Sequence, residues 1–127
     1  MTALATHAVD LRAAPGDQMV GRAMGLFAEA VKRRYGNRLR GLYLFGSRAR
    51  GDHKPHSDID VAVVVGREVS GRGETKPLTE AAYDIFLETG AEIQPWLFHE
   101  DEWSTAAGPR ARLVRAAKRD ARTIGVT

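Results

Sequence analysis

The chain has 127 residues and a formal net charge of +3, a length that fits one compact domain and leaves little room for a second. Hydrophobic residues make up 43% of it and charged residues 28%, enough for a core and ordinary for a globular domain. There is no cysteine and no apolar run of about 18 residues, which excludes disulfides, zinc–thiolate sites and a transmembrane helix.

The start of the chain shows no sustained periodicity. We therefore expect residues 1–16 to form a loose N-terminal arm and residues 17–127 to form a single domain. Residues 1–10 have neither the basic region nor the long apolar stretch of a signal peptide. With no export signal and no cysteine, a cytoplasmic location is the default expectation.

The first helix is predicted over residues 18–35. Asp17 is a plausible N-cap, and Gly36 is a plausible stop because glycine readily takes the left-handed conformation just past a helix. Residues 39–45 follow as a strand with apolar side chains on both faces, which is typical of a central strand covered on both sides. The helix prediction rests on apolar residues at helical spacing, namely Val20, Met24, Phe27 and Val31.

Strands and helices alternate through the rest of the chain. This pattern predicts an α/β fold, in which a short mixed β-sheet packs with α-helices. In chain order we expect a loop (46–57), a strand (58–65), a flexible connection (66–76), a helix from Pro77 to about Glu88, a strand (91–98), a short acidic helix start (99–103), and a last helix from Pro109 to about Thr123.

Two aspartates open the second predicted strand. Asp58 and Asp60 are one residue apart, so their side chains point to the same face of the sheet. Two carboxylates held side by side repel each other, and a bound divalent cation, most often one that carries a phosphate, is the usual reason to keep them together. The sequence therefore predicts a metal site at the start of this strand.

Residues 45–52 (FGSRARGD) and 57–61 (SDIDV) frame the loop between the two strands. The frame resembles the nucleotidyltransferase superfamily to which DNA polymerase beta belongs. More closely, it resembles the minimal nucleotidyltransferases of bacteria and archaea, small single-domain members that are commonly paired with a HEPN-domain ribonuclease. The resemblance implies a nucleotidyltransferase fold.

Each residue of this frame has a physical role in the site that the resemblance implies. Gly46 lets the backbone approach a phosphate without a Cβ in the way. Ser47 offers a hydroxyl and an N–H to phosphate oxygens, at a turn that could open a short helix. Asp58 and Asp60 would ligate Mg²⁺, which takes oxygen ligands. Arg48 is favoured as a further nucleotide-binding residue, because it adjoins Ser47 and a guanidinium grips phosphate bidentately.

The resemblance also implies a third carboxylate on a neighbouring strand. Glu92 fills this position if the strand register places it beside Asp60, and it then completes the catalytic and metal-binding set. In the other register Gln94 lies there, and its amide is a weaker ligand that cannot act as a base.

Several other charged residues have ordinary explanations. Arg50 could contact phosphate or be a solvated loop charge, and His53 and His56 are read as solvated loop residues. The last predicted helix carries a basic strip that is usually a solvated face, although it could meet an acidic partner or RNA. Because few aromatic residues interleave with this strip, RNA binding is not expected. The strip comprises Arg110, Arg112, Arg115, Lys118, Arg119 and Arg122.

The function implied by the resemblance is Mg²⁺-dependent transfer of AMP from ATP to a protein hydroxyl. The acceptor would be a tyrosine of a HEPN-type toxin, and this chain would be the antitoxin. Superfamily members that modify drugs or RNA generally carry an extra helical domain, for which this chain has no room. Two alternatives stay open: a binding module that neutralises its partner by occlusion, and a protein that binds RNA through the basic helix. No membrane partner is expected.

Overall fold

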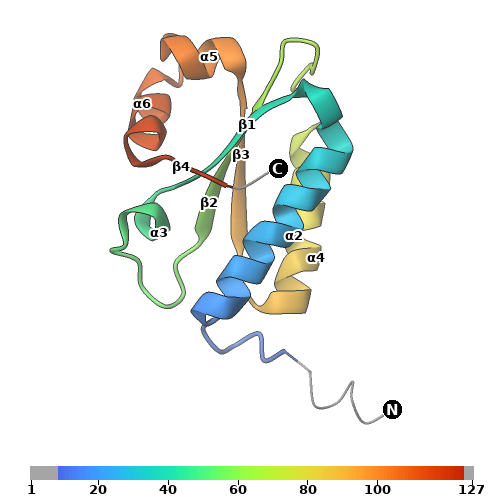
Figure 1. Cartoon of the computed structure of the whole chain (residues 1–127), viewed down its shortest axis with the longest axis vertical. Coiled ribbons are helices and arrows are strands. Elements are labelled where there is room, and N and C mark those ends of the chain that lie inside the picture. Colours follow the sequence, from blue (N-terminus) through green and yellow to red (C-terminus); the bar gives the residue numbers. More distant parts are fainter. Residues whose placement is uncertain (1–8, 125–127) are drawn as a thin grey trace.

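A computed structural model describes residues 9–124, which form a four-stranded sheet in the order β3-β2-β1-β4 (Figure 1). Strand β1 is antiparallel to both of its neighbours, whereas β2 and β3 are parallel. The mixed sheet with helices packed against it confirms the α/β prediction. The strands are β1 (Leu39–Phe45), β2 (Ile59–Val65), β3 (Ile93–His99) and β4 (Arg122–Thr123).

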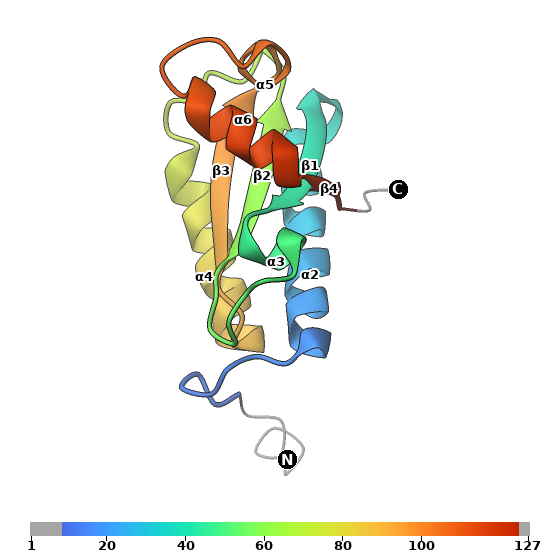
Figure 2. The ribbon, with the colours of Figure 1, turned by 90° about the vertical axis from the view of Figure 1, so that its left-hand side faces the viewer.

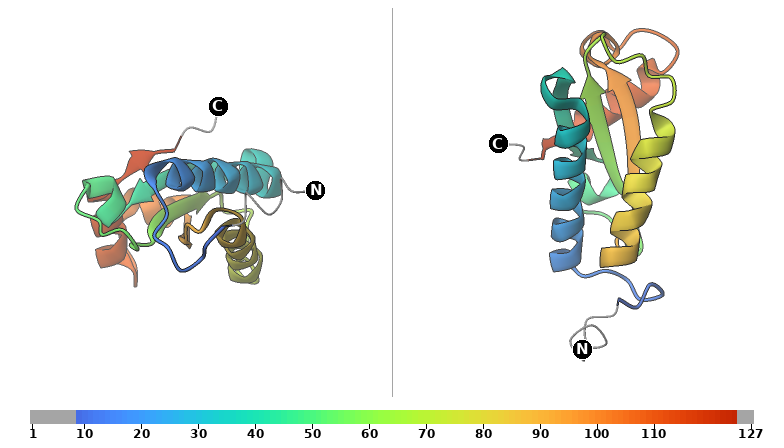
Figure 3. Two further views of the ribbon diagram at one scale, coloured as in Figure 1. Left: turned by 90° about the horizontal axis from the view of Figure 1, so that it is seen from below. Right: turned by 90° about the vertical axis from the view of Figure 1, so that its right-hand side faces the viewer.

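Helices cover both faces of the sheet. The two long helices, α2 and α4, lie side by side on one face, as Figure 3 shows. The short helices α3, α5 and α6 lie on the other face (Figure 2). The helices are α2 (Asp17–Tyr35), α3 (Ser47–Arg50), α4 (Thr75–Thr89), α5 (Glu100–Thr105) and α6 (Ala111–Asp120), and a short 3₁₀ turn, η1 (Gly36–Arg38), leads into β1.

Strand β2 contributes side chains to the hydrophobic cores on both faces of the sheet, because alternate side chains of a strand point to opposite faces. Val61 and Val63 are fully buried under α2 and α4. Ala62 and Val64 face the second core, together with Val114 of α6. A strand that is buried on both sides holds the carboxylates at its start in a fixed place, which is the main contribution of the fold to the site.

Most of the predicted elements are confirmed close to their expected ends. Helix α2 runs over Asp17–Tyr35, but the residue that precedes it is Gly16, so Asp17 is the first helical residue rather than the N-cap. Gly36 ends it with a φ of 55°. The central strand 39–45 is confirmed residue for residue, with neighbours on both sides. The short acidic helix is confirmed as α5.

The end of the chain differs from the prediction. We expected one helix to reach about Thr123, but α6 ends at Asp120, and Arg122–Thr123 form β4. Ala121 is extended, with a ψ of 131°, and Ile124 donates its backbone N–H to the carbonyl of Leu42 at 3.0 Å. The apolar residues continue at helical spacing past Asp120, which favoured a longer helix. Residues 122 and 123 instead pair with the edge of β1, and local periodicity cannot predict pairing with a strand that is distant in sequence.

The N-terminal arm lies largely outside the described residues, which begin at Val9. Among residues 9–124, no helix is both long enough and apolar enough to cross a membrane.

Candidate active site

Gly46 lies in direct contact with Asp60 where β1 ends. Phe45, the last residue of β1, pairs with Asp60, and Gly46 then turns the chain with φ 77° and ψ −158°. A Cβ at this glycine would lie only 2.4 Å from Oδ2 of Asp60. Both the backbone conformation and the close approach therefore require glycine here. The structure brings the predicted glycine–serine corner and the second aspartate together.

Asp60 is partly buried, and its pKa is raised above its ordinary value of 3.8. Burial is the largest cause, because it disfavours the charged carboxylate. The indole of Trp96 donates its Nε1–H to Oδ1 at 3.3 Å, which lowers the pKa, while the charge of Asp58 raises it again. The two carboxylates therefore act on each other, each disfavouring the charged form of its neighbour.

The register of β3 decides which residue lies beside Asp60. Ile59 pairs with Ile93 and Asp60 pairs with Gln94. Glu92 was expected to be the third carboxylate only if the register placed it beside Asp60, and the register places Gln94 there instead. Glu92 lies two residues before Gln94, just ahead of the first residue of β3, and it is exposed on the same face as Asp60. The hydrophobic pattern correctly predicted which side chains of β3 share a face. A shift of β3 by two residues along β2 leaves every side chain on the same face, so the pattern cannot determine the register.

Glu92 is accordingly not gathered with the two aspartates into one compact cluster. Within residues 9–124, no three histidine, aspartate or glutamate side chains lie close enough together to hold a metal ion. The residue paired with Asp60 is Gln94, whose side chain offers an amide oxygen on the same face.

Arg48, which the sequence favoured as a nucleotide-binding residue, and Arg50 differ in their contacts. Arg48 uses its guanidinium on backbone carbonyls, bonding Ser57 at 3.0 Å and Pro55 at 3.1 Å, so it fastens the loop that precedes β2. Arg50 contributes a positive charge that lowers the pKa of Asp60. It also bonds Asp120 at 2.7 Å, tying α3 to α6. Arg50 is therefore the better-placed cation near the carboxylates.

Ser47 begins α3 directly after the corner, so the turn predicted to open a helix does so. Its backbone carbonyl accepts from Gly51 and Asp52, at 2.9 and 3.1 Å. Helix α3 has no side-chain cap, so the Ser47 hydroxyl is not used to cap it. Ser47 directly follows Gly46 and is half-buried.

The basic strip of α6 is largely engaged within the domain. Arg110 pairs with Glu102 at 2.6 Å, and Lys118 donates to the carbonyl of Trp103 at 2.9 Å. Arg115 reaches the carbonyl of Ala106 at 3.4 Å. These contacts fasten α6 to α5 and account for part of the strip without a nucleic-acid partner.

Trp96 lies beside Asp60, although the sequence analysis did not assign it to the site. Its ring packs against Phe45, with 6.3 Å between ring centroids, and its N–H reaches Asp60. A tryptophan two residues beyond Gln94 on the same face was the available signal, but only the register connects it with Asp60.

Comparison with known proteins agrees with this geometry. A family model described as a nucleotidyltransferase domain matches residues 25–120, which include the corner, both aspartates and all of β3. The chain belongs to the nucleotidyltransferase domain family. This family membership supports nucleotidyl transfer as the chemistry of the site.

Individual relatives match more narrowly. A protein of Methanocaldococcus jannaschii named as a candidate protein adenylyltransferase is 44% identical over 43 residues, which are 34% of this chain and 43% of the relative. This chain therefore matches less than half the length of that protein. A crystal structure of a candidate nucleotidyltransferase from Sulfolobus solfataricus has a TM-score of 0.44 and 24% identity, covering 71% of this chain and 81% of the other.

Replacing Trp96 by phenylalanine is expected to raise the pKa of Asp60 further. The variant keeps a ring against Phe45 but loses the donor that stabilises the carboxylate. A carboxyl whose pKa is raised on folding binds protons more tightly in the native state, so stability falls as pH rises from the unfolded pKa through the folded one. In the Trp96→Phe variant, this loss of stability should extend to higher pH.

Carboxyl ¹³C NMR titration of Asp60 measures the change directly, and chemical unfolding across the acid range measures its effect on stability. Trp103→Phe is the matched control, since Trp103 stacks on Tyr43 and packs at a tilt against Phe98. An unchanged Asp60 pKa in Trp96→Phe would mean that the indole does not hold the carboxylate.

Proposed function

We propose that this nucleotidyltransferase domain transfers AMP from ATP to a hydroxyl of a protein, with Mg²⁺ at Asp58 and Asp60. We further propose that the acceptor is a tyrosine of a HEPN-type ribonuclease toxin and that the transfer makes this chain the antitoxin. The relative named as a candidate protein adenylyltransferase supports a protein acceptor, and the resemblance of the corner to the minimal nucleotidyltransferases supports the toxin as partner.

The observation that carries the proposal is the contact between Gly46 and Asp60. A Cβ at Gly46 would overlap an Asp60 oxygen, so the absence of a side chain lets the backbone that leads to Ser47 lie directly against the carboxylate. The donors around it are carboxylate and amide oxygens, the ligands that Mg²⁺ prefers. The residues present therefore fit the ion, which would be held by Asp58, Asp60 and an oxygen from Glu92 or Gln94.

The reaction needs little covalent chemistry from the chain. The acceptor oxygen forms a bond to the α-phosphorus of ATP. The bond between the α-phosphorus and the oxygen that bridges to the β-phosphate breaks, and pyrophosphate leaves with the electron pair of that bond. The acceptor proton passes to a nearby carboxylate or to water. Bound Mg²⁺ would neutralise charge on the phosphates. The chain itself positions the phosphates against Gly46 and the Ser47 hydroxyl, and Arg50 adds a positive charge nearby.

One observation favours the alternative of neutralisation by occlusion. Gln94, a neutral residue, lies beside Asp60, where a third carboxylate would complete the site. An amide cannot accept the acceptor proton, and it binds a divalent ion less well than a carboxylate does. A domain with this residue could bind ATP and its partner and still transfer slowly.

Transfer and occlusion are separated by one experiment. The purified chain is incubated with α-³²P-ATP, Mg²⁺ and the HEPN-type ribonuclease proposed as its partner, and both labelling and complex formation are followed. Label on a tyrosine of the partner, lost when that tyrosine becomes phenylalanine, supports transfer. A stable complex that suppresses the ribonuclease without any label supports occlusion and overturns the enzymatic proposal.

A further inference from the structure

Strand β3 forms an open edge of the sheet. It lies at the end of the strand order, with β2 on one side only. Ile59 donates its N–H to the carbonyl of Glu92 at 2.9 Å, so the backbone groups of Glu92 and Gln94 face β2. The backbone groups of Ile93 and Pro95 therefore face away from the sheet, where another strand could pair with them.

The open part of this edge is short. In the described part of the chain, no hydrogen bond uses the outward N–H and C=O of Ile93 or the C=O of Pro95. Pro95 has no N–H to offer, and the carbonyl of Leu97 is already taken by Arg110 at 2.8 Å. Proline and an occupied carbonyl protect this edge from pairing with long strands. What remains accepts an extended segment of only a few residues.

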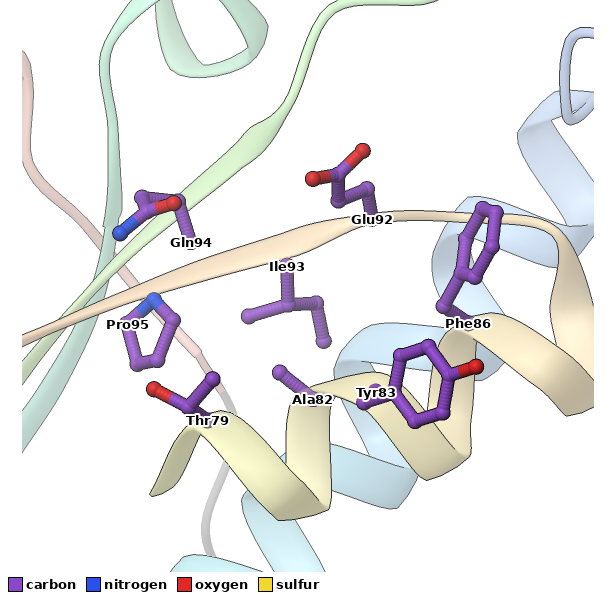
Figure 4. A pocket seen from close by; sticks show the side chains of 8 residues that line it. All are labelled: Thr79, Ala82, Tyr83, Phe86, Glu92, Ile93, Gln94 and Pro95. Atoms are coloured by element: carbon purple, nitrogen blue, oxygen red, sulfur yellow. The ribbon is translucent and has the colours of Figure 1, made fainter. Parts of the chain in front are cut away.

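A groove of about 260 Å³ runs along this edge, between β3 and α4 (Figure 4). The side chains of Ile93 and Pro95 point toward α4, whereas those of Glu92 and Gln94 point to the opposite side, toward the face that carries Asp60. The α4 wall of the groove consists of Thr79, Ala82, Tyr83 and Phe86. An extended peptide at the edge would thus place alternate side chains in an apolar groove and on the face of the site.

The charge around the groove selects a cationic occupant. Although the whole chain is positive, the stretch from Pro77 to Pro109 contains no lysine or arginine. Glu92 lines the groove and is exposed, and among residues 9–124 it takes part in no ion pair. Among residues 9–124, Glu80 and Asp84 of this stretch likewise take part in no ion pair, whereas Glu88, Glu100, Asp101 and Glu102 each pair with an arginine.

We propose that the edge of β3 binds the acceptor as an extended peptide segment, with a cationic side chain beside Glu92, an apolar side chain over Ile93 and the acceptor tyrosine beside Gln94. This inference rests on the proposed function, and it names the form in which the substrate is presented. Backbone pairing with Ile93 supplies affinity, and the groove and Glu92 supply specificity.

The position of the site explains why the acceptor is a tyrosine. Gln94 is paired with Asp60, so the added strand lies two inter-strand spacings from β2, about 10 Å. A serine or threonine hydroxyl stays close to its own backbone, whereas a tyrosine hydroxyl extends over β3 toward Asp60. The geometry therefore disfavours short hydroxyl side chains as acceptors.

The probe is the acetylated and amidated pentapeptide Lys-Val-Tyr-Val-Lys, whose order reads the same in both chain directions. Its binding to the full chain is followed by ¹⁵N NMR without nucleotide or Mg²⁺. The amide of Ile93 should shift on binding, and the amide of Gln94, already bonded to β2, should shift less. A peptide N-methylated on tyrosine and both valines should bind at least about tenfold more weakly, because it lacks the backbone donors.

Two matched variants locate the binding site. Thr79→Trp, at an exposed position of α4, fills the groove and should weaken binding at least about tenfold. Leu87→Trp lies on the same helix at an exposed position outside the lining of the groove and should leave binding unchanged. Equal binding by Thr79→Trp and the unaltered chain, or self-association of the chain through the Ile93 amide, would overturn the proposal.

Labelling separates this inference from the proposed function. If the partner protein is labelled from ATP equally well by Thr79→Trp and by the unaltered chain, the peptide site is wrong and nucleotidyl transfer stands. If the probe binds as expected but the partner is never labelled, the site stands as an interaction surface and the transfer proposal fails.

Discussion

Replacing Asp60 by asparagine is expected to lower nucleotidyl transfer on the order of 10³-fold, because one of the two carboxylates proposed to hold Mg²⁺ becomes a neutral amide. The same change should raise the stability of the fold. Asp60 is partly buried beside Asp58, and its raised pKa means that the charged form is less favourable in the folded chain than in the unfolded one. Activity and thermal stability should therefore move in opposite directions.

Labelled-ATP transfer and thermal unfolding at neutral pH measure the two effects. Asp52→Asn is the matched control, since Asp52 is an exposed carboxylate of the same loop, paired with Arg50. It should keep most of the activity and gain no stability. An Asp60→Asn variant that transfers as fast as the unaltered chain would exclude Asp60 from the chemistry.

Replacing Gly46 by alanine is expected to be the most damaging single-carbon change in the site. The added Cβ would overlap Oδ2 of Asp60, and alanine rarely adopts the φ and ψ found here. The backbone strain costs about 1–3 kcal/mol, and displacement of the carboxylate should reduce transfer by about 10²-fold or more. Chemical denaturation gives the first quantity, and transfer kinetics give the second.

Gly51→Ala separates strain from contact. Gly51 ends α3 with a φ of 88°, yet a Cβ there meets nothing within 4 Å. This variant should lose about 1–2 kcal/mol of stability through its backbone alone and keep its activity. If both variants lost activity equally, strain in the loop rather than contact with Asp60 would explain the loss at Gly46.

The first half of the site could be predicted from sequence because it depends on neighbours along the chain. Gly46 and Ser47 directly follow β1, Asp58 directly precedes β2, and Asp60 is its second residue, so one connection between two neighbouring strands carries all four. The helix α2 and the strand β1 were predicted almost to the residue for the same reason, since local periodicity carries them.

The second half could not be predicted, because it depends on how distant segments meet. Whether Glu92 or Gln94 lies beside Asp60 is set by the parallel register across the α4 crossover, and both registers satisfy the same hydrophobic pattern. The strand at Arg122–Thr123 was missed because its partner is β1, far away in sequence. The hydrogen bond from Trp96 to Asp60 could not be predicted either, because it depends on the same register.

The segment from β1 to β2 contains the corner and both aspartates, whereas β3 brings Gln94 and Trp96 to Asp60. Under the proposed function, the groups that would hold the nucleotide and the group that would limit the rate of transfer therefore lie on different segments of the chain. A substitution at residue 94, which is exposed, should then change the rate of transfer without unfolding the segment that carries the aspartates.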